Sequence, residues 1–140
     1  MPRVPHPKSP GVEVGVTETM IRRLVHDFYA KVRQDEILGP IFEARVQNWE
    51  AHLSTMCTFW SSVILMTGCY KGQPMEVHAR LPEISDAHFE RWLQLFKGSA
   101  RECCDSEAAS LFVDRAERIA ESLKMGIAVR RDNSAYLCAN

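Results

Sequence analysis

Apolar residues recur every three or four positions in four long segments of the chain, which is the spacing of one face of an α-helix. The first of these segments covers residues 17–36, and Thr17 is a good N-cap for it. Its apolar side chains form one stripe, with Tyr29 beside it: Ile21, Leu24, Val25, Phe28 and Val32. The glycine and proline of the sequence LGPIF then end this predicted helix.

Three more helices are predicted on the same grounds, over residues 47–68, 86–104 and 107–128. Ser85 can cap the third helix, and Asp105 or Ser106 the fourth. The shared face of the second helix contains Trp49, Leu53, Met56, Trp60 and Val63, with His52 at its margin. The inner stripe of the third contains Phe89, Trp92, Phe96, Ser99 and Cys103, and that of the fourth Leu111, Phe112, Ala116, Ile119 and Leu123.

A much shorter helix is predicted between Pro74 and Pro82, with His78 near its middle. So short a helix contributes little stability alone, which suggests that a group outside the chain holds it in place. No segment predicts a strand, so the fold class is all-α. The expected organisation is a disordered, proline-rich leader over residues 1–16, a folded domain over 17–128 and a flexible tail over 129–140.

Length and charge narrow the function classes. A chain of 140 residues suits one domain, and a net charge of -1, from 17 basic and 18 acidic residues, predicts no nucleic-acid partner. The longest apolar run, residues 63–66, is too short to span a bilayer, and the N-terminus has no apolar signal core. These features predict a soluble cytoplasmic domain without a membrane partner.

Cysteine and histidine spacing argues against a metal cluster. The five cysteines contain no CxxC motif, and the histidines form no HxxxH pair, so a zinc site is poorly supported. Adjacent Cys103 and Cys104 are either a redox pair or, more commonly, small core residues. A metal with a single protein ligand stays open, because a porphyrin can supply the in-plane bonds, as in haem iron held by one histidine.

Several pieces of the chain together resemble the truncated haemoglobins, and specifically their third group. The resemblance covers the chain from Phe28 to about Met125. The pieces are FYAKVRQDEILGPIF, WEAHLSTMCTFWSSVILMTGCYKGQPMEVHARLP and HFERWLQLF, in family order. Each piece is a weak motif alone, but the set is specific. The resemblance implies a two-over-two helical sandwich around haem b, iron protoporphyrin IX.

Residue roles follow from the resemblance alone. It implies that His78 is the proximal iron ligand and that Tyr29 and Trp92 are distal hydrogen-bond donors. It implies that His52, on the distal helix, binds the ligand or acts as a gate. Apolar or aromatic contacts to the porphyrin are implied for Phe42, Met56 and Trp60. Cations near the propionates are implied at Arg80, Arg91 and Lys71. Without the resemblance, Tyr29 and Trp92 would be interpreted as core residues, and His52 as a boundary residue.

The predicted function is therefore a haem protein that binds O₂, NO, CO or another diatomic ligand. An enzyme is the alternative: the same site could act as a nitric oxide dioxygenase or a peroxidase, supplied by an unidentified reductase. A third hypothesis is a haem-free helical interaction module. The chain departs from the family pattern in its long leader, in the short connection between Phe42 and Trp49, and in Met56, which is more oxidisable than an aliphatic residue.

Overall fold

The computed structural model describes residues 4–70, 72 and 84–139, with the backbone alone for residues 130–139. The described residues form helices and no strand, which confirms the all-α prediction. In chain order these are α1 (Pro10–Glu13), α2 (Glu18–Gln34), α3 (Gly39–Arg45), α4 (Trp49–Leu65), α6 (Asp86–Cys103) and α7 (Ser106–Ala139).

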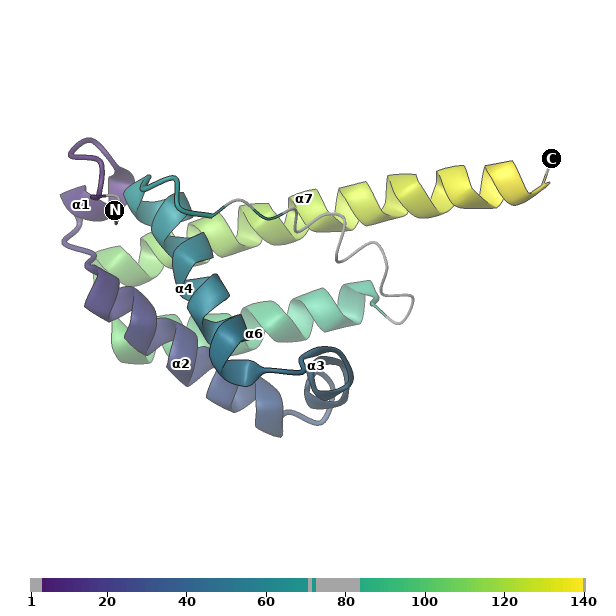
Figure 1. Cartoon of the computed structure of the whole chain (residues 1–140), viewed down its shortest axis with the longest axis horizontal. Coiled ribbons are helices and arrows are strands. Elements are labelled where there is room, and N and C mark those ends of the chain that lie inside the picture. The colour runs from purple at the N-terminus through teal and green to yellow at the C-terminus, as the bar shows by residue number, and fades with distance from the viewer. Residues whose placement is uncertain (1–3, 71, 73–83, 140) are drawn as a thin grey trace.

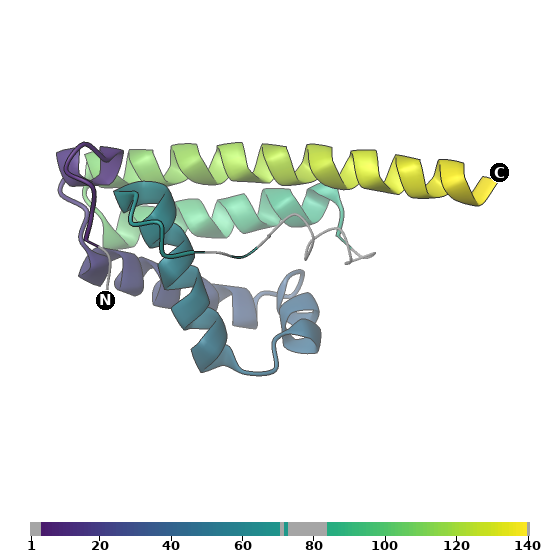
Figure 2. The ribbon, with the colours of Figure 1, turned by 45° about the horizontal axis from the view of Figure 1, so that its top comes forward.

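Two pairs of helices make the body of the molecule (Figure 1). Helices α6 and α7 run side by side, and α2 packs on α6 from the other side. Helix α4 crosses α2 (Figure 2). The α2–α4 and α6–α7 pairs correspond to the predicted two-over-two arrangement. At its C-terminal end α7 extends beyond the other helices, as helix to Ala139, past the predicted end at residue 128.

The residues that we predict as caps stand at the starts of α2, α6 and α7. The Thr17 hydroxyl accepts a hydrogen bond from the Met20 amide at 3.2 Å and so begins α2. At the start of α6, the His88 Nδ1 accepts from the Ser85 amide at 2.9 Å. Asp105 Oδ1 accepts from the Ala108 amide at 3.0 Å, which identifies Asp105 as the residue that caps α7.

The core lies where α2, α4, α6 and α7 meet. Every residue of the predicted stripe on α2 is buried, and so is Tyr29. On α4 the buried residues are Trp60, Ser61, Ile64 and Leu65, so of the predicted face only Trp60 is buried, and Val63 is partly buried. Trp49, Leu53 and Met56, toward the N-terminal end of the helix, are only partly buried and pack against the edge of the core.

The N-terminal segment packs against the end of α4. The Ser9 hydroxyl accepts from the Val12 amide at 3.3 Å and caps the single turn of α1. The His6 amide donates to the Leu65 carbonyl at 2.8 Å. Gly11 lies so close to α4 that an added Cβ would meet the Ile64 side chain at 2.5 Å. This part of the leader is therefore packed against the domain, whereas we predict the leader to be disordered.

Helix α3 is an element that the sequence interpretation missed. The first long helix ends at Gln34, before the Gly39-Pro40 pair that we predict as its end, and Pro40 stands in the first turn of a new seven-residue helix. Proline suits this position because its missing amide would have no partner there. Helix α3 carries Phe42, and α3 packs against the C-terminal end of α2.

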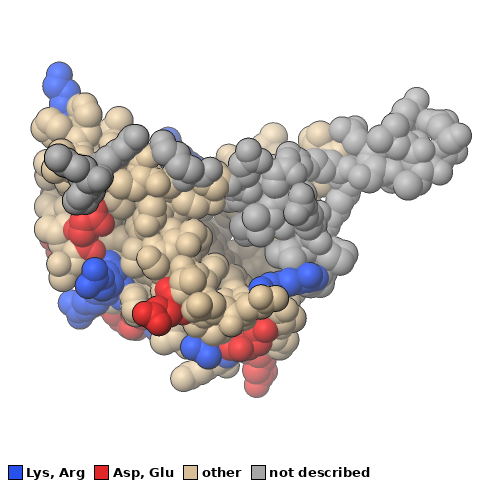
Figure 3. All heavy atoms as spheres, in the orientation of Figure 1, with Lys and Arg blue, Asp and Glu red and all other residues tan. Residues whose placement is uncertain are grey.

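Charged side chains of both signs are interspersed on the face shown in Figure 3, and the coloured part of that face carries no patch of one sign. No helix in the described part of the chain is long and apolar enough to cross a bilayer. The four cysteines whose side chains are described, Cys57, Cys69, Cys103 and Cys104, are free thiols.

Candidate functional site

Tyr29 and His52 face each other between α2 and α4. Tyr29 lies on the inner face of α2 and is 6% exposed. His52 lies in the first turn of α4 and is partly buried. Their ring centroids are 5.0 Å apart and the ring planes stand at 86°, so the edge of one ring meets the face of the other. The structure thus brings together two residues to which the resemblance gives distal roles.

Two further rings, Phe42 from α3 and Trp49 from the start of α4, complete an aromatic cluster around this pair. The Phe42 ring lies 5.8 Å from Tyr29 and 6.3 Å from His52. The Trp49 ring lies 5.6 Å from His52, at 89°, and 6.1 Å from Tyr29. Three helices therefore contribute to one compact cluster, hereafter the aromatic cluster: Tyr29, Phe42, Trp49 and His52.

Burial sets the protonation of the two ionisable members of the cluster. Burial raises the pKa of the Tyr29 phenol far above its usual value, so the phenol keeps its proton and remains a hydrogen-bond donor. Burial also lowers the pKa of His52, which favours the neutral imidazole. Both His52 Nε2 and Trp49 Nε1 are buried and have no hydrogen-bond partner among the described residues. Buried polar atoms normally have a partner, so these two nitrogens mark a place where a ligand can bind.

Trp92 reaches the cluster through Phe28. Its ring stacks on Phe96 at 5.5 Å and 13°, and meets Phe28 edge-on at 5.6 Å. Phe28 in turn contacts Tyr29 at 4.8 Å. Trp60 lies on the far side of Phe96, stacked at 5.0 Å and only 3% exposed, so the structure places it in the core rather than in the aromatic cluster.

An ion pair between buried Asp35 and partly exposed Arg91 ties the α2–α3 turn to α6, next to Trp92. Asp35 Oδ1 accepts from Arg91 Nε at 2.7 Å, and Oδ2 accepts from the Ile37 and Leu38 amides at 3.0 and 2.9 Å. Burial alone would raise the pKa of the Asp35 carboxyl, but the bonds from Arg91 and the two amides outweigh burial and lower the pKa. Arg91 therefore pairs with Asp35, although it is also a candidate for a haem propionate.

Several predicted site residues lie outside the described part of the chain. They are the proposed axial ligand His78, and Arg80 and Lys71, both considered for propionates. Met56 is described: it lies one turn after His52 and packs, partly buried, against the core. Sequence reasoning did not assign Trp49 to the site. The signal was present, because Trp49 precedes His52 by three positions, which places both on one face of a helix.

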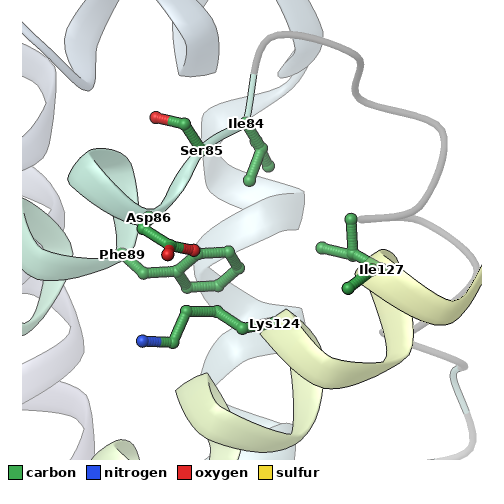
Figure 4. A pocket seen from close by; sticks show the side chains of 7 residues that line it. Ile84, Ser85, Asp86, Phe89, Lys124 and Ile127 are labelled. Carbon is green, nitrogen blue, oxygen red and sulfur yellow. The ribbon is translucent and has the colours of Figure 1, made fainter. Parts of the chain in front are cut away.

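A separate cavity of about 90 Å³ lies between the start of α6 and the middle of α7 (Figure 4). The Phe89 ring lies between Asp86 and Lys124, and Ile84 and Ile127 point toward the same space. The cavity is smaller than the roughly 300–1,000 Å³ of ordinary ligand sites, and no predicted site residue lines it. Within the described ranges, no group of three or more His, Cys, Asp or Glu side chains could hold a metal ion.

Comparison with known proteins identifies the family. The model of the bacterial-like globin family matches residues 13–124. The chain is also 35% identical, over 109 residues, to the group 3 truncated hemoglobin of Campylobacter jejuni, covering 75% of this chain and 86% of that protein. The chain belongs to the group III truncated haemoglobins.

Solved structures agree with this assignment. The crystal structure of the group III truncated hemoglobin from Campylobacter jejuni matches with a TM-score of 0.77 at 33% identity, covering 80% of this chain and 91% of that one. The truncated hemoglobin of Tetrahymena pyriformis matches at 17% identity with a TM-score of 0.66, covering 86% and 97% of the two chains, and supports the fold alone. The confirmed fold is thus the truncated globin, and the chain is a haem-binding globin.

The residues of this truncated haemoglobin fit a haem group. A porphyrin needs apolar and aromatic walls, and the polarity of the distal pocket decides how a ligand is held. The aromatic cluster would supply such walls from three helices, and within it lie a protonated phenol and two ring nitrogens that have no protein partner in the described structure. This donor set suits a small, weakly charged ligand, whereas a cluster of carboxylates would suit a metal ion held by protein ligands alone.

Proposed function

We propose that this truncated haemoglobin carries haem b and binds O₂ or another diatomic ligand at a polar distal pocket. The observation that carries the proposal is the Tyr29–His52 pair, with ring centroids 5.0 Å apart. Haem supplies an iron that takes the diatomic ligand, with one imidazole, proposed to be that of His78, as its axial ligand. Phe42 and Met56 would line the pocket, and Arg80 would pair with a propionate. Trp60 supports the pocket from the core.

The proposed donors act by hydrogen bonding to the ligand. The raised pKa of Tyr29 keeps its O–H in place across the physiological range, and Trp92 contributes an indole N–H, which is a donor only. A hydrogen bond to an acceptor with negative charge is worth about 1.5–3 kcal/mol, or roughly a 10- to 150-fold slower escape of the ligand. His52, neutral and without a hydrogen-bond partner among the described residues, can bind the ligand or act as a gate.

Absorption spectra of the ferric, ferrous and CO forms test this proposal. The spectra report whether haem is bound and which axial ligands it has. His78→Ala should abolish haem uptake or change its axial-ligand signature, whereas His26→Ala, at an exposed position of α2, should leave both unchanged. Haem uptake that is identical in His78→Ala and the wild type would reject the ligand assignment.

Tyr29→Phe tests the distal donor. The variant keeps the ring and its contacts but removes the O–H, so O₂ should dissociate about ten times faster or more. Tyr70→Phe is the matched control, because Tyr70 packs edge-on against Phe59 at 5.2 Å, away from the aromatic cluster. Equal dissociation rates in Tyr29→Phe and the wild type would remove Tyr29 from the proposed site.

A haem-dependent redox enzyme is the second candidate, because Tyr29 and His52 together could move a proton near a bound ligand. Nitric oxide dioxygenation or peroxidase-like turnover would require an unidentified reductase as a partner. Stopped-flow mixing of the oxygenated protein with nitric oxide distinguishes the two functions. The absence of fast oxidation would exclude the dioxygenase.

A further inference from the structure

Trp49 lies between the site and the surface. It is the first residue of α4, and Arg33, in the last turn of α2, places its guanidinium carbon 4.5 Å from the centre of the Trp49 ring. Glu43 of α3 holds that guanidinium through an Arg33 Nε–Glu43 Oε1 distance of 3.1 Å. One residue each from α2, α3 and α4 therefore forms a chain of contacts that ends on the indole.

The other side of the indole contacts the histidine of the site. The Trp49 and His52 rings are 5.6 Å apart at 89°, and their spacing of three positions places them on the same face of α4. Phe42 packs against both rings, at 6.4 Å from Trp49 and 6.3 Å from His52. A movement of the indole would therefore change the space in which the imidazole sits.

Within the part of the chain that the structure describes, ring contacts rather than hydrogen bonds hold the side chains of both residues. His52 Nε2 and Trp49 Nε1 are buried and have no hydrogen-bond partner among the described residues. Among the described residues, the contacts that position the His52 ring come from the three rings around it, those of Tyr29, Phe42 and Trp49. Tyr29 belongs to the buried face of α2, whereas Trp49 stands at a helix end and is itself held from outside by Arg33. Trp49 is thus the adjustable contact.

We propose that Trp49 is a positioning residue that holds the His52 ring against Tyr29, and that Arg33, fixed by Glu43, clamps Trp49 from outside. This inference rests on the proposed distal role of His52 and adds to it a means of setting the gate. Loss of the clamp or of the indole lets His52 leave its inward position more often. A ligand then enters the site more quickly.

A double-mutant cycle measured by CO association tests the inference. Edge-to-face ring contacts and exposed cation–π contacts are weak, so Trp49→Leu should speed CO association about two- to tenfold and Arg33→Gln about two- to fivefold. Trp49→Phe, which keeps a ring, should restore part of the wild-type rate. In a His52→Ala background neither Trp49→Leu nor Arg33→Gln should change the rate further. An equal effect in both backgrounds would mean that Trp49 does not act through His52, and would overturn the inference.

A second readout needs no bound ligand. In the full chain before haem is added, NMR shifts of the His52 ring protons should move in Arg33→Gln, which keeps the indole but removes its clamp, since these protons lie in the ring current of the indole. Arg118→Gln is the matched control, because Arg118 is an exposed arginine paired with Asp114 at 3.2 Å. Unchanged His52 shifts in Arg33→Gln would overturn the inference even if haem binding holds.

The two experiments also separate this inference from the proposed function. Wild-type protein that fails to take up haem would reject the proposed function, while the NMR shifts would still test whether Trp49 positions His52. Arg33→Gln changes an exposed side chain, so it keeps the test available if Trp49→Leu does not fold.

Discussion

Asp35→Asn should destabilise the fold by an amount that the structure lets us estimate. The Asp35 side chain is 3% exposed and receives hydrogen bonds on both oxygens, from Arg91 on one and from the Ile37 and Leu38 amides on the other. Asparagine has a single acceptor oxygen, and its amide nitrogen can only donate. Whichever way it turns, one set of donors loses its acceptor.

The loss should be about 2 kcal/mol in the free energy of unfolding. A hydrogen bond to a charged group contributes about 1.5–3 kcal/mol, and a buried donor left without an acceptor costs about 1–3 kcal/mol. The Arg91 side chain is 39% exposed, so water can replace part of the hydrogen bonding that Arg91 loses, which favours the lower half of both ranges. If the asparagine oxygen stays with the two amides, the change falls on Arg91 alone.

Urea unfolding followed by circular dichroism measures this loss. Asp114→Asn is the control: its carboxylate is 46% exposed and pairs with Arg115, so its change should stay within about 0.5 kcal/mol. A loss for Asp35→Asn as small as that of the control would refute the reasoning.

The pH dependence of the same measurement gives a second check. Because the folded-state pKa of Asp35 lies below its ordinary value of 3.8, its stabilisation is present above about pH 4 and is lost as the pH falls through the folded-state pKa. The difference between the wild type and Asp35→Asn should therefore shrink in acid. A difference that is constant with pH would refute the assignment to this carboxylate.

Two further predictions concern the leader and the cysteines. Gly11→Ala should lower the free energy of unfolding by about 1–3 kcal/mol, because its Cβ would meet Ile64 at 2.5 Å. Gly98→Ala on α6 should raise the free energy of unfolding by about 0.5–1 kcal/mol, because its Cβ would meet only the end of Lys31 at 3.6 Å. Urea unfolding of both variants checks this, and equal effects would contradict the packing of α1 on α4. Burial raises the pKa of Cys104 to about 11, so iodoacetamide should alkylate Cys104 far more slowly at neutral pH than exposed Cys69. Mass spectrometry of the timed reaction measures both rates. Fast alkylation of Cys104 would instead favour a reactive Cys103–Cys104 pair.

Periodicity predicted the long helices because their inner faces pack against one another in the hydrophobic core. On α2 the predicted stripe and its Thr17 cap are both confirmed, since local signals and burial agree there. The same local signals misled at residues 39–45, because the Gly-Pro pair that predicted the end of one helix is the beginning of the next, and the first helix has already ended at Gln34. Prolines in the leader suggested disorder, but the contact of Gly11 with α4 depends on tertiary packing that sequence spacing does not contain.

The candidate site was predictable to a different degree. Spacing alone could place Tyr29, His52 and Trp92 on helices, and only the resemblance gave them a common purpose. The structure adds that Tyr29 and His52 are neighbours and that Trp49 completes their surroundings. Those contacts join α2 to α4, and no regularity within one helix predicts a contact between two. His78 and Arg80 stay predictions, because they lie outside the described residues.

The two proposed donors and His52 are held in different ways, and the difference bears on how the site would work. Tyr29 is buried on the inner face of α2, and Trp92 is stacked on Phe96, so the core fixes both rings before any ligand arrives. The His52 imidazole is held by ring contacts at the N-terminal end of α4. There the Trp49 ring is covered by Arg33, which pairs with Glu43, and both of these charged side chains are about half exposed. If Trp49 positions His52 as proposed, a small change at the surface would move His52 and leave Tyr29 and Trp92, which the core holds, in place. Rates of ligand entry and exit should then respond to different substitutions, those near Arg33 changing entry and those at Tyr29 changing exit.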